Sequence, residues 1–346
     1  MSIKRIAQMA GVSIATVSRV LNNPDYRCSS EEVRERIFEA AREINYTPNL
    51  QARNLKMGVK SNKDAVRRIN ILVTRMEHDR TDPFFVELLH VIQNDIREKE
   101  CIPGRVWYEP LFSDDKKVSE INIEKKIMKL LSGDEKIESD GLVIIGKCNE
   151  KVLTVLKNKC KNIVSINRNS TNYVVDEVVC DGAKIAGLAI DYLVSRGHKN
   201  IGYVGNCYNE MRYHGYMDAL KRHGLELQVG YIVEAEQTEA SGYLTMERLS
   251  GKSDVPTAFY CANDSLALGM LKYLSEKKWK GYCPAIISSD GIEKAEEFSP
   301  RLSTVRVPKK DMGRLAIAIL LDRMENRHES VVKLELNGEL FRGETC

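Results

Sequence analysis

The chain has 346 residues, of which 43% are hydrophobic and 29% are charged, and its net charge at pH 7 is +3. This composition is ordinary for a soluble globular protein of two or more domains, and it excludes a disordered or fibrous chain. No apolar run approaches the ~20 residues needed to cross a bilayer, and the N-terminus lacks the apolar stretch of a secretory signal. We therefore expect a cytoplasmic protein with no membrane partner.

The net charge is unevenly distributed along the chain. Residues 1–68 carry a net charge of +6, whereas the remaining residues carry −3. A polyanion would therefore bind the N-terminal segment. The nine cysteines form no CxxC pair and have no histidine partner at ligand spacing, so we expect neither a metal site nor a disulfide framework, and no cofactor.

Residues 3–22 predict two short helices packed around a tight turn at Gly11, which is a helix-turn-helix. The apolar residues at helical spacing on both sides of the glycine are Ile6, Ala10, Val12, Val17, Val20 and Leu21. Ser13 is placed to cap the second helix through Thr16. That helix would begin with Ile14 and Ala15 exposed, which suits contact with thymine methyls and base edges, and Arg19 could reach a guanine or a phosphate.

A third helix is expected to complete this small domain. Residues 29–32 offer an N-cap with early acidic residues, and the apolar positions that follow at helical spacing are Val33, Ile37, Ala40, Ala41 and Ile44. Pro48 then ends the helix. We place the DNA-binding headpiece at residues 1–58.

A short helical stretch within residues 49–57 is a candidate hinge helix. It is too short to be stable alone, so it could fold on binding, with Leu55 free to wedge between base steps in a minor groove. The alternative is a frayed linker. Residues 59–68 are polar and unpatterned and are expected to form a linker between domains.

From Ile69 onward, short apolar strands alternate with helical stretches. Strands are expected at 69–73, 142–145, 163–166, 201–204, 258–261 and 285–288, and helices at 84–99, 152–156, 183–195, 210–223 and 265–275. This alternation predicts parallel sheets covered on both faces, and the length favours two doubly wound subdomains. A small-molecule site is expected in the cleft at the carboxyl ends of the strands.

The chain resembles the LacI/GalR family of transcription regulators from end to end. The motifs that carry the resemblance lie at residues 10–22 (AGVSIATVSRVLN), 46–49 (YTPN), 82–85 (DPFF), 195–202 (SRGHKNIG), Arg212 with Gly215 and Tyr216, 256–264 (PTAFYCAND) and 302–306 (LSTVR). The resemblance implies an all-α headpiece and an α/β core similar to periplasmic binding proteins. We assign residues 69–168 and 296–325 to its N-subdomain, and 169–295 and 326–346 to its C-subdomain.

The resemblance also implies roles for individual residues. The residues expected to contact DNA are Ser13, Ile14, Ala15, Thr16, Ser18, Arg19, Asn22, Asn49, Ala52 and Leu55. For a small-molecule effector it points to Arg212, Asn263 and Asp290, with Asp82, Phe84, Asn167 and Gln237 as further lining candidates. A homodimer would require a nearly palindromic operator, because a two-fold protein pairs with two-fold DNA.

The chain departs from the family pattern at two places in the cleft. It has Ser288-Ser289-Asp290-Gly291 where many relatives carry Gly-Phe-Asp-Asp, and Asn167 where they carry an aspartate before Arg168. The stretches 82–85, 140–146 and 303–308 resemble relatives that control galactoside or other glycoside use. We therefore expect a sugar or glycoside effector without naming which one.

Three functions are weighed. The first is a DNA-binding regulator, most simply a repressor, with a co-repressor or activator mode as alternatives. The second is a sugar-active α/β enzyme, but the chain has no GxxxxGK[ST] loop, no GxGxxG after a first strand and no GxSxG elbow. The third is an architectural DNA-binding protein, which would leave the cleft domain without a purpose.

Overall fold

The computed structural model describes residues 3–22, 31–43, 67–75, 82–131, 139–169, 174–208, 210–250, 252–277 and 282–346. These residues form two compact units, an N-terminal helical unit and an α/β core that begins at Arg67. The predicted fold class is confirmed, and each unit is described in turn.

The N-terminal unit contains three helices, α1 (Ile3–Ala10), α2 (Ile14–Asn22) and α3 (Glu31–Glu43). They share one small core, whose buried members are Ile6, Ala7, Ala10, Val17, Val20, Ile37, Ala40 and Ala41. Val12, Leu21 and Val33 are only half-buried at its edge. Because these side chains recur at helical spacing, each helix buries one stripe and leaves its polar face outside. Ile44 lies outside the described residues.

The first sheet of the core has the strand order β11-β5-β4-β3-β1-β2. Its strands are β1 (Arg68–Val73), β2 (Ile102–Tyr108), β3 (Gly141–Ile145), β4 (Ile163–Asn167), β5 (Asp176–Val179) and β11 (Lys333–Glu335). β1, β3, β4, β5 and β11 run parallel to their neighbours. Their carboxyl ends therefore lie along one edge of the sheet.

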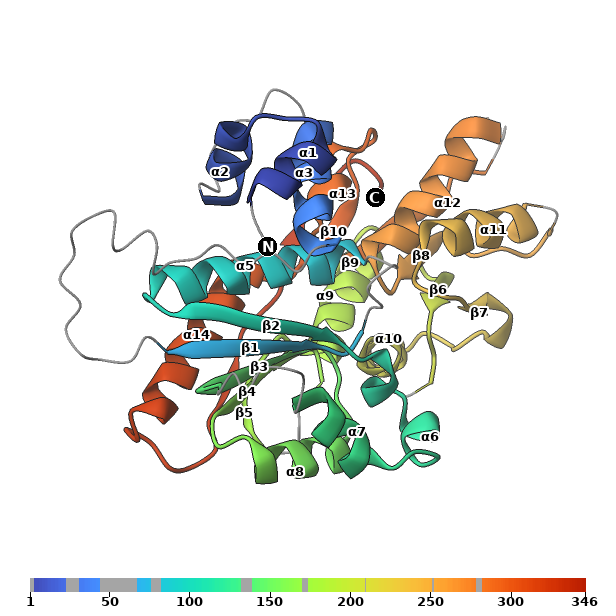
Figure 1. Ribbon diagram of the computed structural model, residues 1–346. Helices are drawn as coiled ribbons and strands as arrows, with labels where there is room; N and C mark the ends of the chain where they lie inside the picture. Colours follow the sequence, from blue (N-terminus) through green and yellow to red (C-terminus); the bar gives the residue numbers. More distant parts are fainter. Residues whose placement is uncertain are drawn as a thin grey trace. The chain divides into compact units, whose positions relative to one another are not determined.

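Both faces of this sheet are buried, which explains why its strands are continuous apolar runs. Along β3, Val143 and Ile145 contribute to one hydrophobic cluster and Leu142 and Ile144 to the other. Helices α5 (Pro83–Glu98) and α14 (Lys309–Met324) belong to the first face, and α7 (Ile123–Leu131) and α8 (Glu150–Lys159) to the second (Figure 1). The short elements η1 (Pro110–Ser113) and α6 (Asp115–Val118) join β2 to α7.

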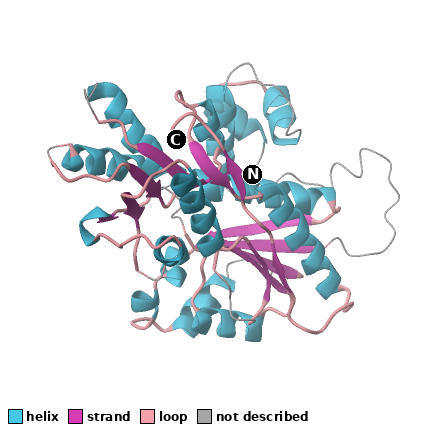
Figure 2. Ribbon diagram, turned by 180° about the vertical axis from the view of Figure 1, so that it is seen from behind, coloured by secondary structure: helices cyan, strands magenta, loops and turns pink. Residues whose placement is uncertain are grey.

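The second sheet has the strand order β12-β10-β9-β8-β6-β7. Its strands are β6 (Ile201–Gly205), β7 (Ile232–Glu234), β8 (Ala258–Cys261), β9 (Ala285–Asp290), β10 (Ser303–Arg306) and β12 (Glu339–Phe341). β12 pairs antiparallel to β10, and the other pairs are parallel. Figure 2 shows the strands of the two sheets from behind.

Four helices pack on this second sheet. α9 (Gly182–Ser195) contacts β8, β9 and β10 and packs against α10 (Met211–Arg222). α12 (Asp264–Lys277) contacts β8 and β9 and packs against α11 (Glu239–Leu249). The short elements η2 (Val229–Tyr231) and α13 (Glu293–Glu297) precede β7 and β10. The core is thus two layered α/β subdomains, as the alternation of strands and helices predicts.

The strands and helices expected from the sequence are present, but the subdomain boundaries differ from the expected ones. β5 and β11 lie in the first sheet although we assigned both to the C-subdomain, and β10 lies in the second sheet although we assigned it to the N-subdomain. The physical reason is that the chain passes between the sheets three times, after β5, after β10 and between β11 and β12. β2 and the strands β5, β7, β10, β11 and β12 were not predicted, because most are short or only partly buried.

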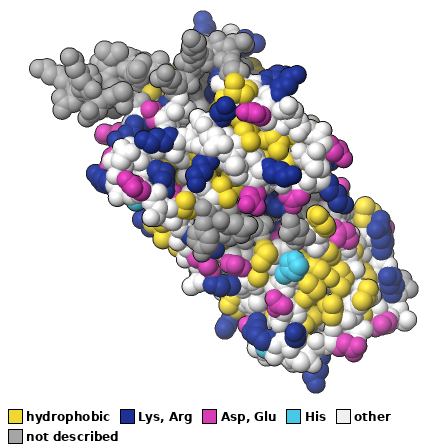
Figure 3. All heavy atoms as spheres, turned by 90° about the horizontal axis from the view of Figure 1, so that it is seen from below, with side chains coloured by type: hydrophobic (Ala, Val, Ile, Leu, Met, Phe, Trp, Pro, Cys, Tyr) yellow, Lys and Arg dark blue, Asp and Glu magenta, His cyan; other side chains and the backbone are white. Residues whose placement is uncertain are grey.

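No helix in the described parts of the chain is long and apolar enough to span a bilayer. The face shown in Figure 3 carries lysine, arginine, aspartate and glutamate side chains interspersed with one another, with hydrophobic side chains gathered mainly in one patch. The described cysteines are free thiols, and burial raises the pKa of several of them, including Cys148 to about 12.

A cluster of charged side chains holds the segment between α14 and β11. The carboxylate of Asp176 on β5 is fully buried and accepts hydrogen bonds from the Arg323 guanidinium, from the Val332 amide at 2.8 Å and from His328 Nε2 at 3.0 Å. His328 Nδ1 lies 2.6 Å from Asp322 Oδ2. Both ring nitrogens therefore face carboxylates, an arrangement that the doubly protonated imidazolium satisfies.

We expect His328 to make the stability of the core depend on pH. Burial alone would lower the pKa of His328, but the hydrogen bonds to Asp322 and Asp176 and the charge of Asp176 outweigh it and raise the pKa, against a smaller opposing effect of Arg323. The stabilisation is therefore complete below the ordinary histidine pKa of ~6.5 and is lost as the pH rises through the raised folded value. His328→Gln should lower the free energy of unfolding more at about pH 6 than at about pH 9, as measured by urea denaturation.

The matched control is His214→Gln, because His214 is an exposed histidine on α10. This control should show no comparable dependence on pH. An equal loss of stability for His328→Gln at both pH values would contradict the assignment of a charged His328.

Candidate functional site

The turn between α1 and α2 is fixed by local backbone chemistry. Gly11 has φ of +67°, a conformation that side chains disfavour. The Ser13 hydroxyl accepts a hydrogen bond from the Thr16 amide at 3.1 Å, and the two side-chain oxygens lie 2.8 Å apart. The predicted N-cap is therefore present, and it sets the direction in which α2 leaves the turn.

The N-terminal end of α2 presents small and apolar side chains to solvent. Ile14 is 51% exposed, an unusual position for an isoleucine in so small a domain, and Ala15 and Ser13 are also exposed. One turn further, Arg19 is exposed, while Thr16 and Ser18 are half-buried. The side chains of Asn22, Asn49, Ala52 and Leu55 lie outside the described residues.

In the core, the predicted ligand residues follow the carboxyl ends of strands from both sheets. Asn167 ends β4, Asp290 ends β9, and Asn263 lies between the end of β8 and the first residue of α12. Arg212 lies at the start of α10, after β6. Because parallel strands bring their carboxyl ends to one edge, side chains that are distant in sequence meet here.

Arg212 is the most deeply buried charge of this site, with 1% of its side chain exposed. Its Nε donates to Glu210 Oε1 at 2.9 Å and its Nη2 donates to Glu210 Oε2 at 3.0 Å, so the pair is bidentate. It also donates to the Ala262 carbonyl and, at 3.2 Å, to Gln237 Oε1. Burial alone would raise the pKa of Glu210, but the charge and hydrogen bonds of Arg212, with the charges of Arg168 and Arg75, lower it to about 2.

Asp290 links the two sheets. Its carboxylate pairs with the guanidinium of Arg168, the residue that directly follows β4 of the first sheet, and lies 3.9 Å from Arg212 Nη1. Burial raises the pKa of Asp290 to about 7, although the charges of Arg168 and Arg212 oppose that rise. Asp290 also has φ of +125°, a region rarely occupied by residues other than glycine, and such strain costs about 1–3 kcal/mol and is typical of functional sites.

An aromatic side chain completes this part of the site. Asp82 caps α5 by accepting a hydrogen bond from the Phe84 amide at 3.0 Å. The Arg168 guanidinium lies 4.5 Å from the Phe84 ring centroid, and Lys309 Nζ lies 5.5 Å from it. Phe84 is therefore already covered by cations in this structure, and a ligand would contact it only by sharing or displacing them.

The amide side chains are partly satisfied. Asn263 donates to the Gln237 carbonyl at 3.1 Å and accepts from the Leu266 amide, so both ends of Asn263 are used. Asn167 is likewise engaged locally, with the Asn169 carbonyl and the Arg168 amide. Gln237 Nε2 and Asn169 Oδ1 are buried without a hydrogen-bond partner among the described residues. Because Gln237 contacts both Arg212 and Asn263, its free donor is one that a polar molecule bound beside them would satisfy.

Sequence reasoning brought Arg212, Gln237, Asn263 and Asp290 to one location, and the structure places them together. It missed Arg75, Arg168, Glu210 and Asn169. The signal for Arg168 was a charged residue directly after an apolar strand, which surface residues share. Glu210 was visible only as the first residue of the helix expected at 210–223, and the structure shows it as the N-cap of α10. No group of histidine, cysteine and carboxylate side chains in the described residues could hold a metal ion.

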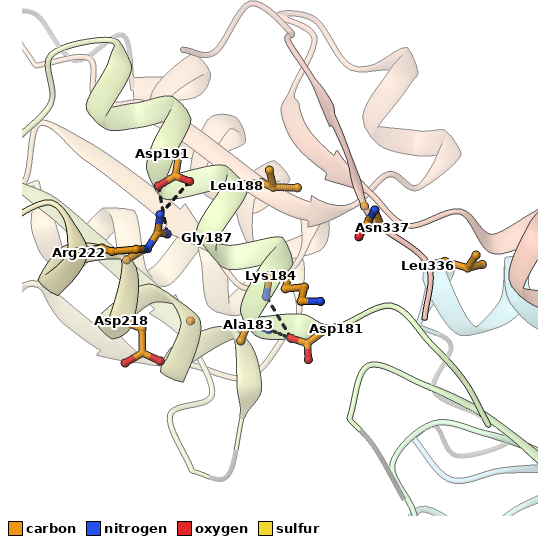
Figure 4. Close-up of a pocket in the computed structure, with 13 residues that line it drawn as sticks. Asp181, Ala183, Lys184, Gly187, Leu188, Asp191, Asp218, Arg222, Leu336 and Asn337 are labelled. Atoms are coloured by element: carbon orange, nitrogen blue, oxygen red, sulfur yellow. Dashed lines mark hydrogen bonds and ion pairs between the residues drawn. The ribbon is translucent and has the colours of Figure 1, made fainter. Parts of the chain in front are cut away.

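A pocket away from these residues is lined by α9, α10 and residues 336–338. It has a volume of about 660 Å³ and is lined by Asp181, Lys184, Asp191, Asp218, Arg222 and Leu336, among others (Figure 4). Asp191 and Arg222 face each other across it and form an exposed ion pair at 3.2 Å. None of the predicted ligand residues lines this pocket.

Comparisons with known proteins agree with both units. Residues 2–49 match the family described as bacterial regulatory proteins, lacI family, and residues 190–346 match a periplasmic binding protein-like domain. The HTH-type transcriptional repressor PurR of Haemophilus influenzae (strain ATCC 51907 / DSM 11121 / KW20 / Rd) is 30% identical over 343 residues, covering 95% of this chain and 93% of the relative. The PurR repressor of Aliivibrio salmonicida (strain LFI1238) is 29% identical over 347 residues, covering 98% and 97%.

A solved structure shows the same fold over the whole length. The complex of the transcriptional regulator CelR with cellobiose superposes with a TM-score of 0.66 at 22% identity, covering 100% of both chains. A helix-turn-helix unit joined to a two-subdomain binding core defines a DNA-binding transcriptional regulator, and the relatives are repressors rather than enzymes. The chain belongs to the LacI family of bacterial regulatory proteins.

We expect the buried Glu210–Arg212 pair to be essential for the stability of the core. Glu210→Gln leaves the Arg212 guanidinium buried without its counter-charge, and removing one partner of such a pair costs about 3–5 kcal/mol. The matched control is Glu296→Gln, because Glu296 is half-exposed and pairs with Arg306 at 2.8 Å. That change should cost at most about 1 kcal/mol. Chemical denaturation of both variants measures the difference, and similar losses would contradict this account.

Proposed function

We propose that this chain is a repressor that binds a nearly palindromic operator as a homodimer and responds to a small molecule, a sugar or glycoside, in the cleft of its core. The observation that carries the proposal is the combination of an exposed apolar N-terminus on α2 with a buried set of charged and amide groups at the strand ends. DNA is the target, so we also place the protein in the cytoplasm.

The DNA-binding part rests on the geometry of α2. A helix enters the major groove with its N-terminal residues against base edges, where methyl contacts with thymine and guanidinium contacts with guanine are possible. Ile14 and Ala15 supply the contacts with thymine methyls, and Arg19 supplies the contact with guanine. Ser13, Thr16, Ser18 and Asn22 would hold phosphates or groove edges, and Asn49, Ala52 and Leu55 would act from the hinge.

The effector part rests on the polar groups of the cleft. A sugar hydroxyl both donates and accepts, so a sugar site needs donors and acceptors together and an apolar surface for the ring. The donors and acceptors are the side chains of Arg212, Asp290, Asn263 and Gln237. The apolar surface is the ring of Phe84. The solved CelR complex holds cellobiose in a protein of the same fold, which supports a carbohydrate as the class.

Contacts between the two subdomains are the means by which a bound ligand would change the conformation of the core. Glu87 on α5 accepts a hydrogen bond from the Glu293 amide at 3.0 Å and pairs with Lys309 at 3.0 Å, while Lys309 also donates to the Gly291 carbonyl at 2.5 Å. A ligand that binds Asp290 would change the balance of these contacts. It can shift the protein between conformations only by its preference for one of them, so release and recruitment of DNA are both compatible with this design.

We expect Arg19→Ala to weaken operator binding by about 1–3 kcal/mol, the usual value of a bidentate base contact. The probe is a duplex that the full chain selects from a random pool, with binding measured by fluorescence anisotropy. Arg196→Ala makes the same change of charge at an exposed position of the core and should leave affinity unchanged. Equal binding of the selected and random duplexes at physiological salt would instead favour an architectural DNA protein.

The effector part is tested by a thermal-shift screen of the full chain against sugars, glycosides and nucleobases, because a ligand at 100 times its dissociation constant stabilises by about 2.7 kcal/mol. Asp290→Asn should weaken the binding of any compound that raises Tm. Asp218→Asn, in the pocket lined by α9 and α10, should not. A compound that raises Tm in both variants equally would show that the effector binds elsewhere.

A further inference from the structure

The charges of three arginine side chains, Arg212, Arg168 and Arg75, act on the carboxylate of Glu210, and the three are not equivalent. Arg212 is held by both oxygens of Glu210, and Arg168 pairs with Asp290 and stacks on Phe84. Arg75, directly after Thr74 at the end of β1, forms no ion pair or hydrogen bond through its guanidinium within the described residues. Of these three arginines, Arg75 is therefore the one whose five guanidinium N–H donors are available to a ligand.

The surroundings of Arg75 hold its side chain in place. The Thr74 hydroxyl donates to the Lys147 carbonyl at 2.6 Å, and the Thr74 amide donates to Ile145. The stem of Arg75 lies over Gly146, where an added Cβ would come within 2.6 Å of Arg75 Cγ and where φ is +100°. A glycine in the left-handed region thus leaves the space that the arginine stem fills.

The nearby carboxylates are committed to other groups. Glu210 uses both oxygens on Arg212, Asp290 pairs with Arg168, and Asp82 caps the Phe84 amide. Burial lowers the pKa of Arg75, and the positive charges of Arg168 and Arg212 add to this effect, while Glu210 and Asp82 oppose it. Arg75 is half-buried, and an additional anion beside it would supply the direct acceptor that its guanidinium does not have among the described residues.

We infer that the molecule bound in this cleft carries an anionic group, a phosphate or a carboxylate, which Arg75 receives through its guanidinium. The inference rests on the proposed effector function and narrows it from sugars in general to acidic sugars. A guanidinium suits both anions, because its parallel N–H groups match two oxygens at once. Gln237 Nε2 is buried without a partner, and Gln237 accepts from Arg212, so this amide remains for a neutral hydroxyl of the same molecule.

The first test uses inorganic phosphate as the probe on the full chain. Sodium phosphate should raise Tm above that in sodium chloride of equal ionic strength, in a saturable manner, and Arg75→Gln should weaken the apparent affinity roughly tenfold or more. Arg196→Gln, an exposed arginine of the core, removes the same charge and should leave the shift intact. Phosphate binding at the N-terminal helices is unaffected by Arg75, so a shift that is equal in wild type and Arg75→Gln, or no shift at all, overturns the inference.

The second test compares matched neutral and acidic compounds, namely glucose, glucose 6-phosphate and glucuronate, and ribose with ribose 5-phosphate. If only the sugar phosphates raise Tm, the anionic group of the ligand is a phosphate. If only glucuronate raises Tm, it is a carboxylate. Arg75→Lys, which keeps the charge without the planar fork, should retain part of the response. Neutral sugars that bind wild type and Arg75→Gln equally well would overturn the anion site.

The two proposals fail in different ways. If a neutral sugar releases or recruits operator DNA and Arg75→Gln does not change this, the proposed regulatory function stands and the anion site is wrong. If an acidic sugar binds through Arg75 but leaves the affinity for the selected duplex unchanged, the anion site stands and control by an effector is wrong. Fluorescence anisotropy with and without each compound separates these outcomes.

Discussion

The buried guanidinium of Arg212 is the constraint on which the rest of the cleft depends. A charge with 1% exposure is tolerated only if its hydrogen bonds and its counter-charge are complete. Glu210, two residues earlier, supplies the counter-charge. Its Oε1 also accepts a hydrogen bond from the Arg212 amide, which caps the start of α10. The remaining donors reach the carbonyl of Ala262, directly after β8, and the side chain of Gln237, between β7 and α11. One side chain therefore holds two loops and the first turn of α10 together.

Much of this arrangement was predictable, because its causes are local. The turn at Gly11, the cap at Ser13 and the apolar spacing of α1, α2 and α3 follow from neighbouring residues, and the alternation in the core follows from strands buried on both faces. The predicted positions Arg212, Asn263 and Asp290 came from the resemblance to the family together with their place after apolar strands. They meet because parallel strands end at one edge.

The features that the sequence did not predict depend on pairing between distant segments. The spacing of apolar residues along the chain does not encode such pairing. β5 and β10 are short, and nothing in their own sequences says which sheet they join, so the expected subdomain boundaries placed each in the other sheet. In the sequence, Arg168 is an ordinary charge after a strand and Glu210 an ordinary charge at a helix start. Their roles become visible only when the structure pairs them with Asp290 and Arg212. Arg75 points to an anionic ligand only because no described carboxylate accepts from its guanidinium. This is seen only after the structure has paired the other charges with one another.

If the core binds an effector as proposed, Asp290 is the residue that would couple binding to conformation. Its carboxylate pairs with Arg168 of the first sheet, its carbonyl accepts from Val307 at 3.1 Å where the chain leaves β10, and its backbone has a strained φ. A molecule that hydrogen-bonds to this carboxylate must share or replace Arg168, and Arg168 in turn covers Phe84 at the start of α5. A ligand bound at the end of β9, as proposed, would therefore change a contact between the two sheets directly. No further chain of residues would be needed to carry its effect from one subdomain to the other.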